Sequence, residues 1–282
     1  MTRCFFVSDI HGRVDRYAKL FQAIELERPR VLFIGGDILA HFGRREAPPD
    51  FIRSYLLAEL ESLRLKLGSE YPRVFIILGN DDLRINEEAL LDERAAALVS
   101  YVHMRKASFD EWAIYGYSMV PPTPFRLKDW ERYDVSRYVD PGSVSPEEGM
   151  RSVPADEHEV RYGTIAADLQ ELTGADDLHN AVLLFHGPPY GTGLDRAQLD
   201  DMTVDHVPLD VHIGSVAICR FIEERQPWLT LHGHVHESAR ITGVWLERMG
   251  RTVAVSAAHD GRELALVRFD LEDPGGATRD LI

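Results

Sequence analysis

The sequence is poor in cysteine and contains no long apolar run, and each shortage excludes a class of protein. Cys4 and Cys219 are the only cysteines among 282 residues, too few for a disulfide framework. No apolar run approaches the roughly 20 residues that span a bilayer. The opening MTRCFFVSDI is typical of a strand and lacks the features of a secretory signal. We therefore expect a protein of the cytoplasm with no membrane partner.

Cationic residues are also scarce. Lys and Arg number 31 against 46 Asp and Glu, which gives a formal net charge of −15. Non-specific binding to nucleic acid needs a cationic field, so nucleic acid is an unfavourable partner for the chain as a whole. The composition is otherwise typical of a globular enzyme, with 45% hydrophobic and 27% charged residues. The length is sufficient for a deep core, and we expect residues 1–282 to form a single domain.

The first half of the chain alternates short apolar runs with helical patterns. Residues such as Tyr17, Leu20 and Ile24 recur at helical spacing between two apolar runs. The order strand, helix, strand, helix, strand is typical of a largely parallel and buried sheet. The expected strands are 3–7, 31–34, 74–78, 101–106, 112–118, 181–185, 228–231, 252–256 and 263–270; the expected helices lie around 17–24, 52–67, 87–98 and 215–224. The tail from Glu272 is rich in glycine and charge, and we expect it to fray.

Residues 121–180 interrupt this pattern. They open with Pro121-Pro122-Thr123-Pro124 and carry 13 acidic residues against 6 basic ones. Two interpretations remain open: a solvated surface excursion, or a lid over a site, since long insertions in compact domains are often functional. In the second case Arg126 or Lys128 would bind a distal phosphate, with Phe125 or Trp130 stacking on a base.

Polar residues follow five of the apolar runs at the point where each run ends. Because the carboxyl ends of parallel strands meet at one edge of a sheet, we expect these side chains to converge. Asp-x-His and His-x-His on extended chain direct two donors to the same side. Imidazole, carboxylate and amide donors without thiolate favour Mn, Fe, Zn or Ni, and Mg less strongly. The five segments are Asp9-Ile10-His11-Gly12, Gly35-Gly36-Asp37, Gly79-Asn80-Asp81-Asp82, His186-Gly187-Pro188-Pro189 and Gly233-His234-Val235-His236.

In this order the five segments resemble the motifs of the calcineurin-like metallophosphoesterases. The resemblance spans residues 9–236 and implies an α/β fold, a four-layer αββα sandwich, here with an acidic insertion. It also implies two divalent metal ions and a hydroxide between them that attacks phosphorus in line, as two-metal sites do. The resemblance places one ion on Asp9, His11, Asp37 and His236, and the other on Asp37, Asn80, His186 and His234.

The third segment departs from the family pattern. The family usually has Gly-Asn-His followed by Asp or Glu, and that histidine is thought to protonate the leaving oxygen; here Asp81 stands in its place, and Asp82 matches the acid. Three interpretations remain open. The substrate has a leaving group that needs little acid help; or Asp81 is itself the acid, with its pKa raised by nearby carboxylates; or the protein mainly binds. A branch of phosphodiesterases with Gly-Asn-x-Asp favours the first.

The missing imidazole would otherwise come from His41, His103, His212 or His259. His212 is the most informative of them because it precedes a helix expected to begin near Ser215, and a helix N-terminus suits an anion such as phosphate. The alternative is a loop histidine followed by an ordinary Ser cap. We take Asp81, Asp82 and His212 as the candidate catalytic residues.

These observations together predict a metal-dependent phosphoesterase. We expect a small phosphorylated substrate, a phosphodiester rather than a phosphomonoester. Two alternatives remain open at this stage: a binding or scaffold protein that retains a vestigial two-metal site, and a nuclease.

Overall fold

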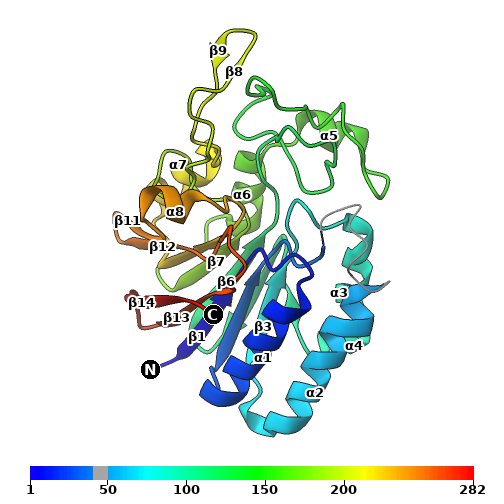
Figure 1. Ribbon diagram of the computed structural model, residues 1–282, viewed down its shortest axis with the longest axis vertical. Coiled ribbons are helices and arrows are strands. Elements are labelled where there is room, and N and C mark those ends of the chain that lie inside the picture. The colour runs from blue at the N-terminus through cyan, green and yellow to red at the C-terminus, as the bar shows by residue number, and fades with distance from the viewer. Residues whose placement is uncertain (41–49) are drawn as a thin grey trace.

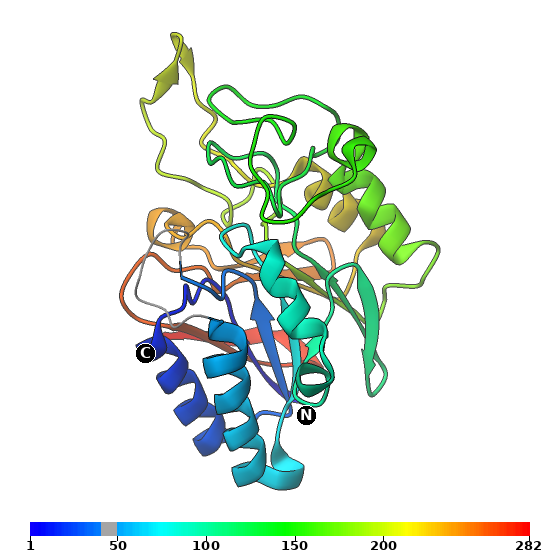
Figure 2. The same cartoon turned by 90° about the vertical axis from the view of Figure 1, so that its right-hand side faces the viewer.

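Two six-stranded sheets pack face to face, with helices on both outer faces (Figures 1 and 2). The computed structural model describes residues 1–40 and 50–282. The first sheet contains, in spatial order, β14 (Asp273–Leu281), β13 (Ala265–Asp270), β1 (Arg3–Val7), β2 (Val31–Gly35), β3 (Arg73–Ile77) and β4 (Ser100–Tyr101). The second contains β11 (Leu246–Met249), β12 (Thr252–Ser256), β10 (Leu229–His232), β7 (Ala181–Phe185), β6 (Trp112–Tyr117) and β5 (Arg105–Phe109). The four-layer sandwich is confirmed.

Side chains along each buried strand point alternately to the two faces of its sheet, and this alternation explains the layers of the fold. In β1, Cys4 and Phe6 belong to the apolar cluster between the two sheets, whereas Phe5 and Val7 pack in the cluster beneath the helices. A strand buried on both faces has to be apolar throughout, which is why the sequence shows continuous apolar runs here. The strands β1, β2 and β3 are parallel, as expected, and β4 also pairs parallel with β3.

Helices cover both outer faces. α1 (Val14–Glu27) and α2 (Leu57–Leu67), the latter preceded by a π-helical turn at Ile52–Leu56, lie on the first sheet (Figure 1). α6 (Ile165–Thr173) and α7 (Val216–Arg225) pack on the second. The helix expected at 87–98 is divided into a 3₁₀ turn at Arg84–Glu87, α3 (Glu88–Leu91) and α4 (Glu93–Ala96), because Asp92 caps a new helix there. Among the described residues no helix is long and apolar enough to cross a membrane.

Two expectations about strands are wrong. Tyr101 does not pair in the expected hairpin; it lies in β4 of the first sheet, and the hairpin partner of β6 begins at Arg105. The tail from Glu272 is not frayed, because β14 pairs antiparallel with β13. Leu264 and Ile282 also exchange two backbone hydrogen bonds of 2.9 Å at its end. Pairing with the preceding strand β13 therefore outweighs the weak local propensity of the tail.

The insertion forms loops, α5 (Glu157–Tyr162) and α6, and it lies at the same end of the molecule as the small hairpin β8 (Thr203–Val204) and β9 (Val207–Pro208) (Figure 1). Contrary to expectation, two residues of the insertion cannot reach a substrate. Lys128 is buried and paired with Glu131, and Trp130 is also buried. That part of the expectation is wrong, whereas Phe125 is exposed.

Candidate metal centre

The five polar segments meet at the carboxyl ends of β1, β2, β3, β7 and β10, so the site joins the two sheets. Backbone hydrogen bonds hold neighbouring segments together. The Asp9 N–H donates to the carbonyl oxygen of Gly36 (3.0 Å), and the Gly233 N–H donates to that of His186 (2.8 Å). The convergence predicted from the sequence is therefore present.

One group of donors forms a compact cluster. The ligand atoms of Asp9, His11, Asp37 and His236 all lie within 4.8 Å of one another. The Nε2 atoms of His11 and His236 are 3.0 Å apart, and His236 Nε2 is 3.1 Å from Asp9 Oδ1. Buried carboxylates and imidazoles that face one another at such distances have the donor chemistry of a divalent cation site.

A second group adjoins the first through Asp37. His186 Nε2 lies 3.0 Å from Asn80 Oδ1 and 3.4 Å from Asp37 Oδ2. The ring centroids of His186 and His234 are 5.3 Å apart. All seven side chains proposed as ligands thus lie in two adjacent groups, with Asp37 between them.

The hydrogen bond of His186 to the main chain fixes which nitrogen faces this cluster. Its Nδ1 lies 2.8 Å from the carbonyl oxygen of Gly35. Because a carbonyl oxygen only accepts, Nδ1 carries a proton, and Nε2 is the atom directed at Asn80 and Asp37. This arrangement is the usual way in which proteins orient a histidine for a metal.

The charges of the cluster depend on one another. Burial alone would raise the pKa of Asp9, but the hydrogen bond and charge of His236 lower it to about 2. The charge of His186 likewise outweighs burial and holds the pKa of Asp37 well below its usual range. Conversely, burial would lower the pKa of both histidines, yet Asp37 raises that of His186 to about 10 and Asp9 raises that of His236 to about 9. The buried carboxylates therefore require positive charge beside them, which bound cations would supply.

The backbone at the site is strained in a way that matches a functional role. Asp9, His11, Asp37 and His234 have φ values of 56°, 53°, 51° and 73°, in the left-handed region that residues other than glycine rarely occupy. Such conformations cost of order 1–3 kcal/mol each and are concentrated at functional sites. A Cβ at Gly79 would lie 2.3 Å from Asp37 Oδ1, so this position must remain glycine for Asp37 to hold its place.

The two acidic candidates lie in different environments. The Asp81 N–H donates to Asp37 Oδ1 (2.8 Å), and the Asp81 carboxylate lies 3.7 Å from His11 Nδ1 with 26% of the side chain exposed. Asp82 is fully buried and accepts from the N–H groups of Ile38 and Gly79, which joins two ligand segments. Burial and the charge of Asp37 raise the pKa of Asp82 to about 8. Its burial does not support the expected catalytic role, because no substrate can touch it; Asp82 positions the loops instead.

The spare histidines also differ. His103 is buried and accepts the N–H of Ser118 (3.0 Å), and burial lowers its pKa to about 3. His259 lies 3.3 Å from Glu263. His212 Nδ1 lies 2.8 Å from Asp195 Oδ1, and one third of the His212 side chain is exposed. His41 lies outside the described residues.

The helix N-terminus next to His212 is occupied by the protein itself. Ser215 caps α7, as expected, by accepting the N–H of Ile218 (3.0 Å). The carboxylate of Asp134, from the insertion, accepts the N–H groups of Val216 (2.7 Å) and Ala217 (3.2 Å) and the hydroxyl proton of Ser215. The expectation of a phosphate at this helix is therefore wrong, because Asp134 supplies the anion. No pattern in the sequence pointed to Asp134 or Asp195.

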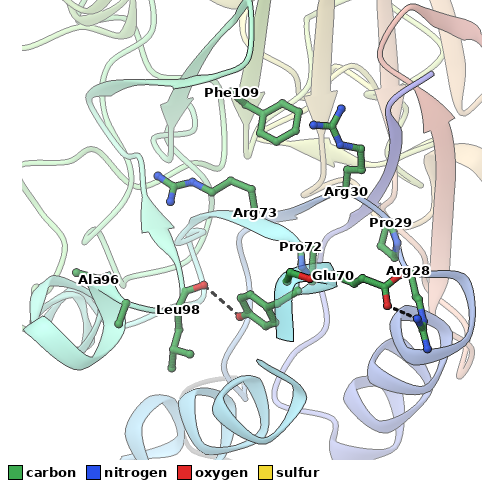
Figure 3. Close-up of a pocket in the computed structure, with 12 residues that line it drawn as sticks. Arg28, Pro29, Arg30, Glu70, Pro72, Arg73, Ala96, Leu98 and Phe109 are labelled. Carbon is green, nitrogen blue, oxygen red and sulfur yellow. Dashed lines mark hydrogen bonds and ion pairs between the residues drawn. The ribbon is translucent and has the colours of Figure 1, made fainter. Parts of the chain in front are cut away.

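A surface hollow of about 520 Å³ lies far from this centre, at the amino ends of β2 and β3 (Figure 3). Arg28, Arg30 and Arg73 contribute its positive charge. Arg28 pairs with Glu70, as drawn, and Arg30 pairs with Asp110 at 3.0 Å. The hollow holds none of the polar segments described above, and we do not assign the chemistry to it.

Comparison with known proteins agrees with the geometry. The family model "calcineurin-like phosphoesterase" matches residues 2–238, and the chain belongs to that family. None of the curated proteins matches the sequence.

Solved structures support the fold. One superposes with a TM-score of 0.60 at 19% identity, covering 99% of this chain and 98% of its own. TT1561 of Thermus thermophilus gives 0.55 at 14% identity, with 99% and 98% covered. A dimetal phosphatase from Danio rerio gives 0.51 at 12% identity, with 94% and 91% covered.

Proposed function

We propose that the protein is a dinuclear metal-dependent phosphoesterase that hydrolyses small phosphodiesters in preference to phosphomonoesters. The observation that carries the proposal is the pair of adjacent donor groups that share the buried Asp37. One ion would be held by Asp9, His11, Asp37 and His236, and the other by Asp37, Asn80, His186 and His234. Manganese, iron, zinc and nickel all suit this ligand set, and magnesium suits it less.

The two ions would lower the pKa of a water molecule held between them and clamp the attacking and leaving oxygens. The protein's own residues prepare the site for this chemistry. Gly35 orients His186 through its carbonyl oxygen. Asp82 fixes the spacing of the loops that carry Asp37 and Asn80 by accepting main-chain N–H groups from both sides. The surrounding contacts also hold Asp9 and Asp37 in the left-handed conformation that their φ values of 56° and 51° show.

Asp81 supports the preference for diesters. It is partly exposed and lies beside His11 at the edge of the cluster, so its charge acts on whatever binds there. A phosphomonoester carries up to two negative charges near neutral pH, and a phosphodiester carries one. A further carboxylate at the opening disfavours the dianion more than the monoanion.

The test is turnover by purified protein loaded separately with Mn²⁺, Ni²⁺ or Zn²⁺. We expect hydrolysis of bis(p-nitrophenyl) phosphate to exceed that of p-nitrophenyl phosphate, and both to disappear in Asp37→Ala. No turnover of any mono- or diester with any of these metals would reject the enzymatic function. Capture of a stable partner by such an inactive protein would indicate the scaffold role instead.

A further inference from the structure

A second polar cluster, outside the proposed metal centre, surrounds Asp195. Its carboxylate is fully buried and accepts four donors. They are the N–H groups of Gly191 (2.9 Å), Thr192 (3.0 Å) and Gly214 (3.1 Å), and Nδ1 of His212 (2.8 Å). A buried carboxylate held by so many donors is a fixed charge that orients whatever it binds.

This cluster directs one nitrogen of His212 outward. Because the carboxylate accepts at Nδ1, that atom carries a proton, and Nε2 is the remaining nitrogen on a side chain that is one third exposed. Within the described parts of the chain, Nε2 has no hydrogen-bond partner and is not sealed from solvent. The ring also makes an edge contact with the ring of Tyr190, with the centroids 5.9 Å apart. The carboxylate of Asp210 accepts hydrogen bonds from the Tyr190 hydroxyl (2.7 Å) and from the main-chain N–H of His212 (2.8 Å).

The segments that carry this pair are attached to the ligand loops on two sides. On one side, the Ser215 N–H donates to the carbonyl oxygen of Pro188 (2.9 Å), two residues beyond His186. On the other, the Gln198 N–H donates to Glu237 Oε1 (3.0 Å), one residue beyond His236. Between these two contacts, Arg196 and His212 pair as an isolated antiparallel β-bridge. The segments that carry the pair are therefore hydrogen-bonded to two loops that supply proposed metal ligands.

We propose that His212 is the general acid of the reaction and that Asp195 is its positioning residue. This inference rests on the proposed phosphoesterase function. As the bond between phosphorus and the leaving oxygen breaks, the electron pair stays on that oxygen, and the proton on His212 Nε2 is transferred to it. The neutral imidazole then takes up a proton from solvent, which balances the proton lost by the attacking water. The carboxylate of Asp195 holds the ring in place through Nδ1, so that Nε2 keeps one direction during the transfer.

The first test compares two leaving groups on the same metal-loaded protein. With methyl phenyl phosphate, whose phenolate leaves poorly, His212→Gln should lower kcat/KM at least about 100-fold, the lower end of what a general acid contributes. With methyl p-nitrophenyl phosphate the same variant should lose less than about fivefold, since that leaving group needs little protonation. His206→Gln, which changes an exposed histidine on the turn between β8 and β9, is the matched control and should leave both rates unchanged.

Equal losses on both substrates, or no loss on either, would overturn the assignment while leaving the phosphoesterase function intact. Absence of turnover by the unaltered protein would reject that function.

A second measurement needs no activity: ¹⁵N spectra of the histidine rings in metal-free protein, with His212→Gln used to assign the signal. We expect the neutral His212 ring to carry its proton on Nδ1, and a proton on Nε2 alone would contradict the proposed pairing with Asp195.

Discussion

Removal of the Asp81 charge should shift the substrate preference toward phosphomonoesters. In the proposed centre, two divalent ions would carry four positive charges; Asp9 and Asp37 would offset two of them, and Asp81 would offset a third. Asp81 Oδ2 lies 3.7 Å from His11 Nδ1, the ring nitrogen opposite the one that faces the cluster. Two unit charges about 6 to 7 Å apart interact with about 2.5 kcal/mol at an effective dielectric constant of about 20.

Partial exposure of Asp81 screens this interaction, and we discount it to about 1–2 kcal/mol, or about 5- to 30-fold. In Asp81→Asn, the ratio of kcat/KM for p-nitrophenyl phosphate to that for bis(p-nitrophenyl) phosphate should rise by that factor. Inorganic phosphate should also inhibit more strongly. Asp81→Glu keeps the charge and is the control. An unchanged ratio in the Asn variant, or an equal rise in the Glu variant, would refute the electrostatic explanation.

Three further predictions test the site and its supports. Gly79→Ala places a Cβ that would lie 2.3 Å from Asp37 Oδ1. Metal affinity measured by calorimetry should therefore fall at least about 10-fold, as on loss of supporting groups, while the circular dichroism spectrum stays unchanged. Wild-type affinity in this variant would show that Asp37 is not a ligand. Addition of Mn²⁺ at about 100 times its Kd to chelator-treated protein should stabilise the fold by about 2.7 kcal/mol for each ion bound in thermal unfolding, whereas no shift in Tm would mean that the ions do not bind the native state. Asp134→Ala removes the anion from the N-terminus of α7; it should lower the free energy of unfolding in urea by about 1–2 kcal/mol, and a change below about 0.3 kcal/mol would contradict the capping role.

The central strands and the five polar segments could be predicted from the sequence. Buried parallel strands are apolar on both faces, so β1, β2, β3 and β7 stand out as continuous runs, and their ends fall within one residue of the expected positions. The polar segments follow directly because the chain leaves each strand at the same edge of the fold. Local chemistry therefore determined where the site would be.

Features that depend on a pairing partner rather than on local propensity could not be predicted in this way. β14 forms only because β13 offers it a ladder, although its own residues favour no strand. Asp134 caps a helix more than eighty residues away, and Asp195 receives donors from two separate turns. A single aspartate in a loop leaves no periodic signal in the sequence. Asp82 was expected to act on substrate because it follows a ligand motif, and only its burial shows that it holds the loops together.

The most direct test of the metal centre is the anomalous difference density of crystals grown with Mn²⁺. The proposed function predicts two peaks that share Asp37 as a ligand, one between Asp9, His11 and His236 and the other between Asn80, His186 and His234. A single peak, or peaks that do not contact Asp37, would contradict the two-metal assignment.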